Sequence, residues 1–250
     1  MILNEIIKKI EEKFPLHLAY EWDNPGLILG DRNREIKKCM VSLDVTEKVL
    51  DEAIDINADL IITHHPLIFS GVKKINSDTA IGRMLLKAAE NKIALYAAHT
   101  NMDMAEYGIN AKLSEIFNMK NTFVINEDGL GLIGDIDKMP LSELLKIIRE
   151  KLDTPFLRYS GNENQLIGKI AICSGSGSEI IENAIKNGAD CVITGDLKYH
   201  TSLDYTSDSF SIIDAGHFPT EKIAMDMFCE ILKDVEVIKS SQKDIFNLFV

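Results

Sequence analysis

The sequence predicts an α/β protein built of two related α/β domains that arose by internal duplication, with mostly parallel strands, crossover helices and a metal site between the halves. Three observations lead to this prediction. Short β-branched runs alternate with segments whose apolar residues have helical spacing. A segment of the first half recurs in the second half. Histidines and carboxylates follow the ends of the predicted strands in both halves.

Composition limits the class of protein. The chain has 250 residues, 46% hydrophobic and 26% charged, which is typical of a soluble globular protein of one or two domains. No segment has the unbroken apolar length that a bilayer-spanning helix needs, and the first residues lack the pattern of an export signal. The four cysteines are dispersed and form no C-x-x-C pair, which suits a reducing compartment. We therefore expect a cytoplasmic protein without a thiolate metal site.

The charge balance argues against one class of partner. The formal net charge of −12 opposes a general attraction to the phosphate backbone, although a local basic patch remains compatible with it. Nucleic acid is therefore a disfavoured partner.

Residues 45–65 (VTEKVLDEAIDINADLIITHH) recur at 175–196 (GSGSEIIENAIKNGADCVITGD). The spacing is 131 residues, both from Ala58 to Ala189 and from Thr63 to Thr194. Two helix-turn-strand units can resemble each other through composition alone. A match without gaps that ends in the same Ile-Thr favours duplication, so we expect both halves to share an architecture.

Each copy predicts a strand, a helix and a second strand. The runs CMVSLD (39–44) and KIAIC (169–173) are short and apolar, and hydroxyl side chains stand where they can cap the helices that follow. The runs DLIIT (59–63) and DCVIT (190–194) then return as β-branched strands. Strands joined through a helix pair in parallel, with a right-handed crossover.

Further elements complete each half. The first half begins with a surface helix in residues 1–15 and adds a helix at 79–92 and a strand at 93–98, whereas in the second half SFSIIDAG (209–216) leads directly to His217. The join between the halves falls near 120–128, and a carboxyl-terminal helix and strand cross back to the first half. The predicted domains are residues 1–124 with 223–250, and residues 125–222.

Polar side chains follow the predicted strands. His64 and His65, His99, Asp196 and His217 each come at the carboxyl end of a strand, the edge at which open α/β sheets bind ligands. Aligning AAHTNMD (97–103) with AGHFPTE (215–221) sets His99-x-x-x-Asp103 opposite His217-x-x-x-Glu221.

Histidine and carboxylate together are metal ligands. Taken alone, Asp103 reads as a helix N-cap and Glu221 as an acid in the first turn of a helix that starts near Pro219. Their convergence with four histidines favours a metal site, and imidazole plus carboxylate suits Zn, Mn, Fe, Co or Ni without selecting one. Adjacent His64 and His65 point in different directions if the strand continues through them, so two neighbouring metals could take one each, bridged by Glu221.

Five segments resemble the Nif-three-like family, whose bacterial members are often labelled GTP cyclohydrolase type 2 homologues. In chain order these segments are EWDNPGLILGD (21–31), ITHHPLIF (62–69), AAHTNMD (97–103), ADCVITGDLKYH (189–200) and DAGHFPTE (214–221). The resemblance extends over residues 1 to 235.

The resemblance implies a pair of related α/β domains, a toroidal homohexamer and two divalent metal ions in each subunit. By motif position it implies metal ligation by His64, His65, Asp103, His217 and Glu221, with Glu221 bridging. His99 would lie beside the ligands and handle protons. Asp196 and His200 would line the cavity, which makes His99 and His200 the candidate catalytic residues.

These features lead to a dinuclear metal-dependent hydrolase, in which a metal-bound hydroxide attacks a small polar substrate such as a nucleotide or another phosphate-bearing metabolite. The rival is a non-catalytic, metal-stabilised ring that binds a protein or nucleic-acid partner, and a third reading is metal storage. The Gly/Ser segment 174–178 joins a strand to a helix and could receive a phosphate, although a tight turn explains it more simply. The pattern G-x-G-x-x-G at 129–134 lies within a strand and is rejected as a dinucleotide site.

Overall fold

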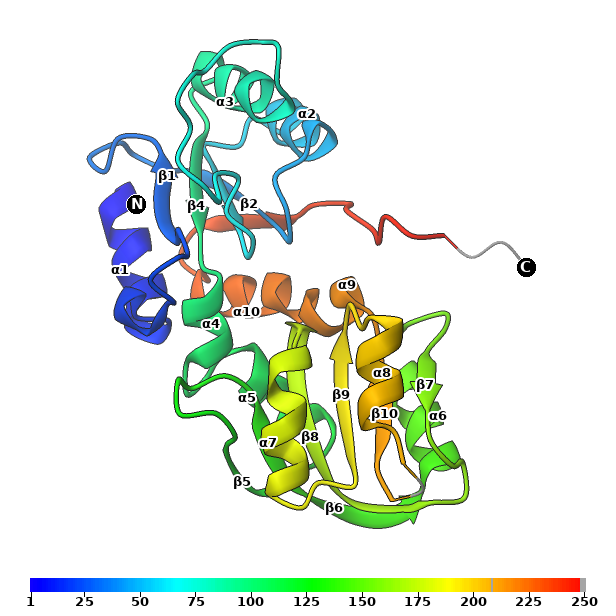
Figure 1. Ribbon diagram of the computed structural model, residues 1–250. Coiled ribbons are helices and arrows are strands. Elements are labelled where there is room, and N and C mark those ends of the chain that lie inside the picture. The colour runs from blue at the N-terminus through cyan, green and yellow to red at the C-terminus, as the bar shows by residue number, and fades with distance from the viewer. Residues whose placement is uncertain (208, 248–250) are drawn as a thin grey trace. The chain divides into compact units, whose positions relative to one another are not determined.

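Two sheets organise the chain, one in each of two compact units. A computed structural model describes residues 1–207 and 209–247 (Figure 1). Unit 1 comprises Met1–Ala105 and Lys222–Lys243, and unit 2 comprises Glu106–Glu221 with the segment that starts at Asp244. The predicted first domain shares residues 1–105 and 223–243 with unit 1. Residues 208 and 248–250, which the predicted domains include, lie outside the described residues.

Unit 1 is built on a five-stranded sheet of order β1-β4-β3-β2-β11. The pairs β4-β3, β3-β2 and β2-β11 are parallel, and β1 is antiparallel at the edge. The elements are α1 (Leu3–Lys13), a 3-10 turn (Leu16–Leu18), β1 (Gly26–Leu29), β2 (Lys38–Ser42), α2 (Glu47–Asp55), β3 (Leu60–Thr63), α3 (Ala80–Glu90), β4 (Ala94–Ala97), α4 (Thr100–Met104), α10 (Ile223–Ile231) and β11 (Glu236–Lys239).

Apolar side chains hold the helices of unit 1 against this sheet. Helices α2 and α3 share a buried cluster with the strands, in which Leu50 and Ala88 of the helices meet Met40 of β2. Phe14, which directly follows α1, and Phe228 of α10 meet edge to face with ring centroids 6.3 Å apart. Burial of such side chains contributes about 1.5–3 kcal/mol each. The amphipathic pattern of the sequence therefore fixes both helical layers.

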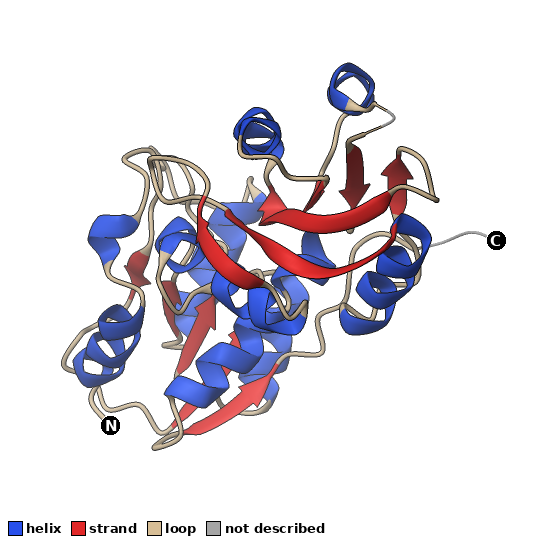
Figure 2. Ribbon diagram, turned by 90° about the horizontal axis from the view of Figure 1, so that it is seen from below, coloured by secondary structure: helices blue, strands red, loops and turns tan. Residues whose placement is uncertain are grey.

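Unit 2 is built on a six-stranded sheet of order β5-β6-β8-β9-β10-β7. Helices α7 and α8 lie on one face and α5 and α6 on the other (Figures 1 and 2). The elements are α5 (Ile109–Ile116), β5 (Lys120–Val124), β6 (Leu132–Pro140), α6 (Leu141–Lys151), β7 (Arg158–Ser160), β8 (Leu166–Ser176), a 3-10 turn (Ser178–Ile180), α7 (Ile181–Lys186), β9 (Cys191–Gly195), α8 (Tyr199–Tyr205), β10 (Ser211–Asp214) and α9 (His217–Glu221).

The predicted α/β class is confirmed, and unit 2 shows where its strands depart from parallel pairing. Only β8-β9 and β9-β10 pair in parallel, while β5, β6 and β7 pair antiparallel. Strands β5 and β6 form a hairpin closed by a turn in which Gly129 N donates to Asn126 O at 3.1 Å, and Gly129 has φ +99°. The join predicted near 120–128 falls on β5 and the start of this turn, which lie within unit 2.

The two units repeat one strand order. In unit 1 the order is β1-β4-β3-β2 and in unit 2 it is β7-β10-β9-β8, with the first strand antiparallel in both. The Asp59 carboxylate accepts from the amides of Lys37 and Lys38 at 2.8 and 3.2 Å. The Asp190 carboxylate accepts from the amides of Gly168 and Lys169 at 2.7 and 2.9 Å, with every partner displaced by the same 131 residues. This agreement supports the predicted duplication.

Some elements have too weak a sequence pattern to be predicted. Helix α8 has no buried residue, and the three residues of β7 are exposed or half-buried, so neither has an amphipathic pattern. Strand β1 is only four residues long. Among the described residues, no helix combines the length and apolar character needed to cross a bilayer.

The paired aspartates provide a test of the shared scaffold. We expect Asp59→Ala and Asp190→Ala each to reduce the free energy of unfolding by about 1–3 kcal/mol, because each leaves two backbone amides without their acceptor. Urea denaturation of the two variants measures this. Asp51→Ala, which removes only an exposed ion pair with Lys87, should stay within about 1 kcal/mol of the parent. A large loss for one aspartate and none for the other would contradict the structural equivalence.

Candidate metal centre

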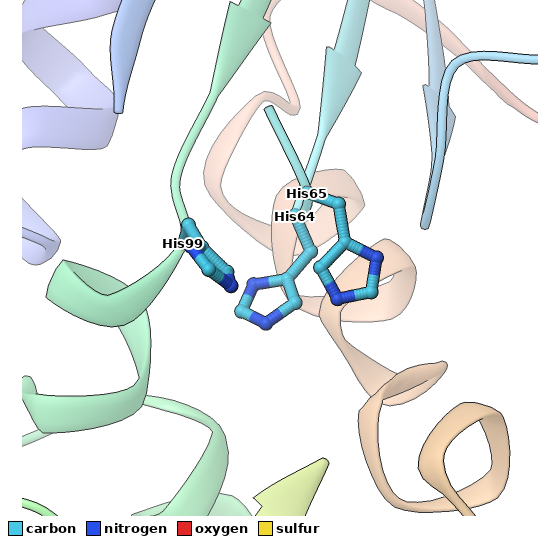
Figure 3. Close-up of side chains that lie close together, drawn as sticks. All are labelled: His64, His65 and His99. Atoms are coloured by element: carbon cyan, nitrogen blue, oxygen red, sulfur yellow. The ribbon is translucent and has the colours of Figure 1, made fainter. Parts of the chain in front are cut away.

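Three histidines of unit 1 converge beyond the ends of two neighbouring strands. His64 and His65 follow β3 and His99 follows β4, and these parallel strands end level because Thr63 pairs with Ala97. One ligand nitrogen from each imidazole lies within 4.8 Å of the others. Figure 3 shows the three rings gathered at this edge. The predicted gathering of imidazoles at the carboxyl edge of the sheet is therefore present in unit 1.

The backbone bends at the paired histidines. Strand β3 ends at Thr63, and the Thr63 hydroxyl donates to His65 O at 2.7 Å, which supports a bend in place of further strand. The rings of His64 and His65 consequently lie with centroids 5.0 Å apart. The condition under which they would point in different directions, an extended strand through both residues, is therefore not met.

Each of these imidazoles is held at Nδ1 by an oxygen acceptor. His64 Nδ1 lies 2.8 Å from Ala98 O, and His65 Nδ1 lies 2.8 Å from Asp44 Oδ1. His99 Nδ1 lies 2.8 Å from an oxygen of Asp23. A carbonyl or carboxylate acceptor places the proton on Nδ1 and leaves the lone pair on Nε2. All three rings are thereby set to coordinate through Nε2.

Asp103 adds a carboxylate to this set. It lies in α4, whose first turn is closed by the amides of Met102 and Asp103 donating to His99 O. Its Oδ2 is 3.6 Å from His64 Nε2, and only 8% of the residue is exposed. Asp103 is therefore not a helix N-cap, the interpretation that it suggests when taken alone, because α4 already begins at Thr100.

Unit 2 presents a second pair of candidate ligands on one helical turn. His217 and Glu221 begin and end α9, an i,i+4 spacing that puts both on one face. Their Nε2 and Oε2 atoms lie 2.9 Å apart, and Glu221 is 3% exposed. Glu221 therefore ends a short helix, whereas the sequence predicted it in the first turn of a longer one.

His217 repeats the arrangement found in unit 1. Its Nδ1 lies 2.7 Å from Asp196 Oδ2. Asp196 has φ +54°, a left-handed conformation that is unusual outside glycine. Asp196 thus contacts the His217 imidazole at Nδ1, the nitrogen opposite the candidate ligand atom Nε2. The sequence instead predicted that Asp196 lines the cavity.

Gly175 leaves the space that the Glu221 carboxylate fills. A Cβ at this position would lie 2.0 Å from Glu221 Oε1 and 3.2 Å from His217 Nε2. The amide of Gly175 donates to Thr220 Oγ1 at 3.0 Å, and that of Ser174 donates to Asn110 Oδ1 at 2.8 Å. The first two amides of segment 174–178 are therefore used within the protein, which favours its reading as a tight turn.

The strand register shows that the two His-x-x-x-acid pairs do not occupy equivalent positions in the two units. Thr63 pairs with Ala97, whereas its counterpart Thr194 pairs with Asp214. His99 therefore corresponds to Gly216, and His217 corresponds to the first residue of α4. The alignment of 97–103 with 215–221 is one residue out of register.

The two candidate catalytic histidines differ in their surroundings. The side chain of His99 is 13% exposed and belongs to the cluster of unit 1. His200 lies on α8, is exposed and contacts the ring of Tyr199 at a centroid distance of 5.4 Å. Within the described residues, His200 belongs to none of the groups that could hold a metal.

Asp23 is a site residue that the sequence did not reveal. Its side chain is fully buried and accepts from His99 and from the amide and hydroxyl of Thr100. Burial raises the pKa of Asp23, but the hydrogen bonds from His99 and Thr100 outweigh this effect and lower the pKa to about 2. The segment EWDN contains Asp23, but no spacing rule connects residues 76 positions apart.

The ligand chemistry and the packing fit a divalent metal. Imidazole nitrogens and carboxylate oxygens suit borderline cations, and the space that a Cβ at Gly175 would fill is occupied by the Glu221 carboxylate. His64 is fully buried, and Asp103 and Glu221 are nearly so. Because isolated buried charges are costly, such groups are expected to be paired or to coordinate metals.

Comparison with known proteins identifies the family. The family model described as Duf34/NIF3 (NGG1p interacting factor 3) matches residues 1–245. The chain belongs to the Duf34/NIF3 family. The resemblance stated from the sequence is thereby confirmed.

Individual NIF3 relatives agree with this assignment. The chain is 41% identical over 260 residues to a Clostridium perfringens protein named GTP cyclohydrolase 1 type 2 homolog, covering 99% of each chain. A Bacillus cereus protein related to NIF3 is 26% identical with a TM-score of 0.89, covering 100% of this chain and 99% of that one. Reduced HcgD from Methanocaldococcus jannaschii is 31% identical with a TM-score of 0.86, covering 97% and 98%.

The role of Gly175 in leaving space for the Glu221 carboxylate can be tested against a second glycine, Gly188. Gly175 and Gly188 have φ +58° and +75°, but a Cβ at Gly188 meets nothing within 4 Å. Alanine at either position should cost about 1–2 kcal/mol of backbone strain. Only Gly175→Ala should also displace the Glu221 carboxylate and lower bound metal, measured by elemental analysis. Equal metal content in the two variants would contradict the assignment of Glu221 as a ligand.

The support that Asp44 gives His65 is open to a similar test. We expect Asp44→Ala to weaken metal binding by about 10–100-fold, because the His65 imidazole loses the acceptor that orients it. Competition with a chromogenic chelator measures the affinity, and Asp31→Ala in the exposed loop after β1 is the control. An affinity that is unchanged in Asp44→Ala would contradict the expectation that His65 is a metal ligand.

Proposed function

We propose that this NIF3 protein is a dinuclear metal-dependent hydrolase that acts on a small polar substrate, a nucleotide or another phosphate-bearing metabolite. One observation carries the proposal: His64, His65, His99 and His217 each have Nδ1 within hydrogen-bond distance of an oxygen acceptor. Histidines buried only for packing do not require this shared orientation. The arrangement favours coordination through Nε2.

The proposed ligands are those that the sequence indicated. His64, His65, Asp103, His217 and Glu221 would hold two divalent ions, with Glu221 as the bridge, and Zn, Mn, Fe, Co and Ni all suit this set. When bound, the metals would supply Lewis acidity and lower the pKa of a water molecule towards neutrality.

The remaining groups would handle protons and exclude solvent. His99 is proposed to accept and return a proton at Nε2, because the Asp23 oxygen 2.8 Å from Nδ1 sets the ring with its Nε2 lone pair directed away from Asp23. The buried imidazole of His64 keeps water away from one side of the centre. His200 is exposed and is proposed as a second proton carrier that meets substrate from solvent.

The substrate class, the assembly and the location belong to the same proposal. The name of the relatives, GTP cyclohydrolase 1 type 2 homolog, supports nucleotides as the first compounds to examine. A toroidal homohexamer follows from the family resemblance, and a cytoplasmic location follows from the dispersed cysteines.

The proposal is tested by metal content and turnover measured together. After chelation and reloading with each metal, the parent should bind metal and turn over members of a panel of nucleotides, phosphoesters and small peptides. The double variant His65→Ala, Glu221→Ala should lose its metal. His99→Ala should keep most of its metal and lose about 10²–10⁴-fold in rate.

The exposed His17 supplies a matched control, and His17→Ala should change neither quantity. Full metal content in the double variant would overturn the ligand assignment. Stable metal with no turnover and salt-dependent retention on DNA would favour the non-catalytic ring instead.

A further inference from the structure

Two large aromatic rings are exposed beside His99. Trp22 is 56% exposed and Phe69 is 49% exposed. Their ring centroids lie 6.3 and 5.6 Å from that of His99, and both rings meet the imidazole edge to face. Tyr20 stacks on Trp22 at 5.2 Å with an interplanar angle of 20°. We call Tyr20, Trp22 and Phe69 the aromatic platform.

The aromatic platform is fixed to its surroundings at several points. The amide of Tyr20 donates to Thr100 Oγ1 at 3.2 Å, and the side chain of Asn24 donates to Ile68 O at 2.7 Å. Between them, Asp23 is bonded to His99. The segments that carry Trp22 and Phe69 are therefore tied to each other and to the histidine cluster, so the rings are held in position before any ligand arrives.

The geometry of the rings suits a flat partner. The planes of Trp22 and Phe69 lie within 32° of each other, with centroids 5.4 Å apart. Half-exposed aromatic faces gain from covering by another ring in offset stacking, and nucleobases stack on such side chains.

We propose that the aromatic platform binds the planar heteroaromatic ring of the substrate, as in a purine nucleotide. This inference rests on the proposed function and deepens it, because a ring stacked on Trp22 or Phe69 has its substituent next to His99. Contact of both rings with a residue of the candidate metal centre favours a substrate over a second copy of the chain.

Fluorescence provides a direct test, because Trp22 is the single tryptophan of the chain. GMP should quench its emission saturably in the metal-loaded protein, and ribose 5-phosphate, which lacks the base, should not. Phe69→Ala should weaken the apparent affinity for GMP by about 5- to 150-fold, the loss expected for one stacking contact. Phe123→Ala, an equally exposed phenylalanine on β5 of unit 2, should leave the affinity unchanged.

Two further variants test the rings without relying on fluorescence. By calorimetry, Trp22→Phe should keep most of the GMP affinity because it retains a flat ring, whereas Trp22→Ala should weaken the affinity by about 5- to 150-fold. The inference is overturned if ribose 5-phosphate quenches as GMP does, or if Phe69→Ala and Phe123→Ala behave alike. It is also overturned if Trp22→Ala abolishes self-association at unchanged GMP affinity.

Metal content, measured on the same samples, separates the two proposals. A chain that takes up no metal overturns the proposed function, whatever the fluorescence shows. A chain that binds metal but shows no response to GMP overturns the ring inference alone.

Discussion

An imidazole can coordinate a metal only if the lone pair of the correct nitrogen faces the ion, and in this protein a hydrogen bond on the opposite nitrogen sets that direction. Two of the acceptors, Asp23 and Asp44, are carboxylates that precede their histidines in unit 1. Asp196 does the same for His217 in unit 2. His64 uses a main-chain carbonyl instead. Without these acceptors the rings could turn about their side-chain bonds, and the candidate centre would lose its preorganisation.

The repeated scaffold carries different chemistry at equivalent positions. Asp44 and Gly175 are separated by 131 residues, the same spacing as between Asp59 and Asp190. The first supports a histidine, and the second is a glycine that makes room for a carboxylate. His65 likewise corresponds to Asp196. The equivalent hydrogen bonds at Asp59 and Asp190, alongside these differences, show that the two units share a backbone arrangement but carry different polar side chains.

Much of the fold could be read from the sequence, because periodicity and β-branched runs report burial directly. The strand-helix-strand units around Ala58 and Ala189, and the placing of His64 and His99 after parallel strands, depend on such local signals. The bend at His65 and the role of Asp23 do not. They arise from hydrogen bonds between residues far apart or from the end of a strand, and single-sequence patterns locate strand ends poorly. The exposed helix α8 has no apolar stripe from which a helix could be predicted.

The hairpin between β5 and β6 has an evolutionary consequence. The tip of its turn carries the exposed residues Glu127 and Asp128. The strands on either side are held in register by the hydrogen bonds between β5 and β6. The ends of the turn are already adjacent, so chain added between them costs loop-closure entropy that rises only with the logarithm of its length. A gene lengthened at this tip would still encode both sheets intact, which makes the tip a natural point at which members of such a family can acquire an additional module.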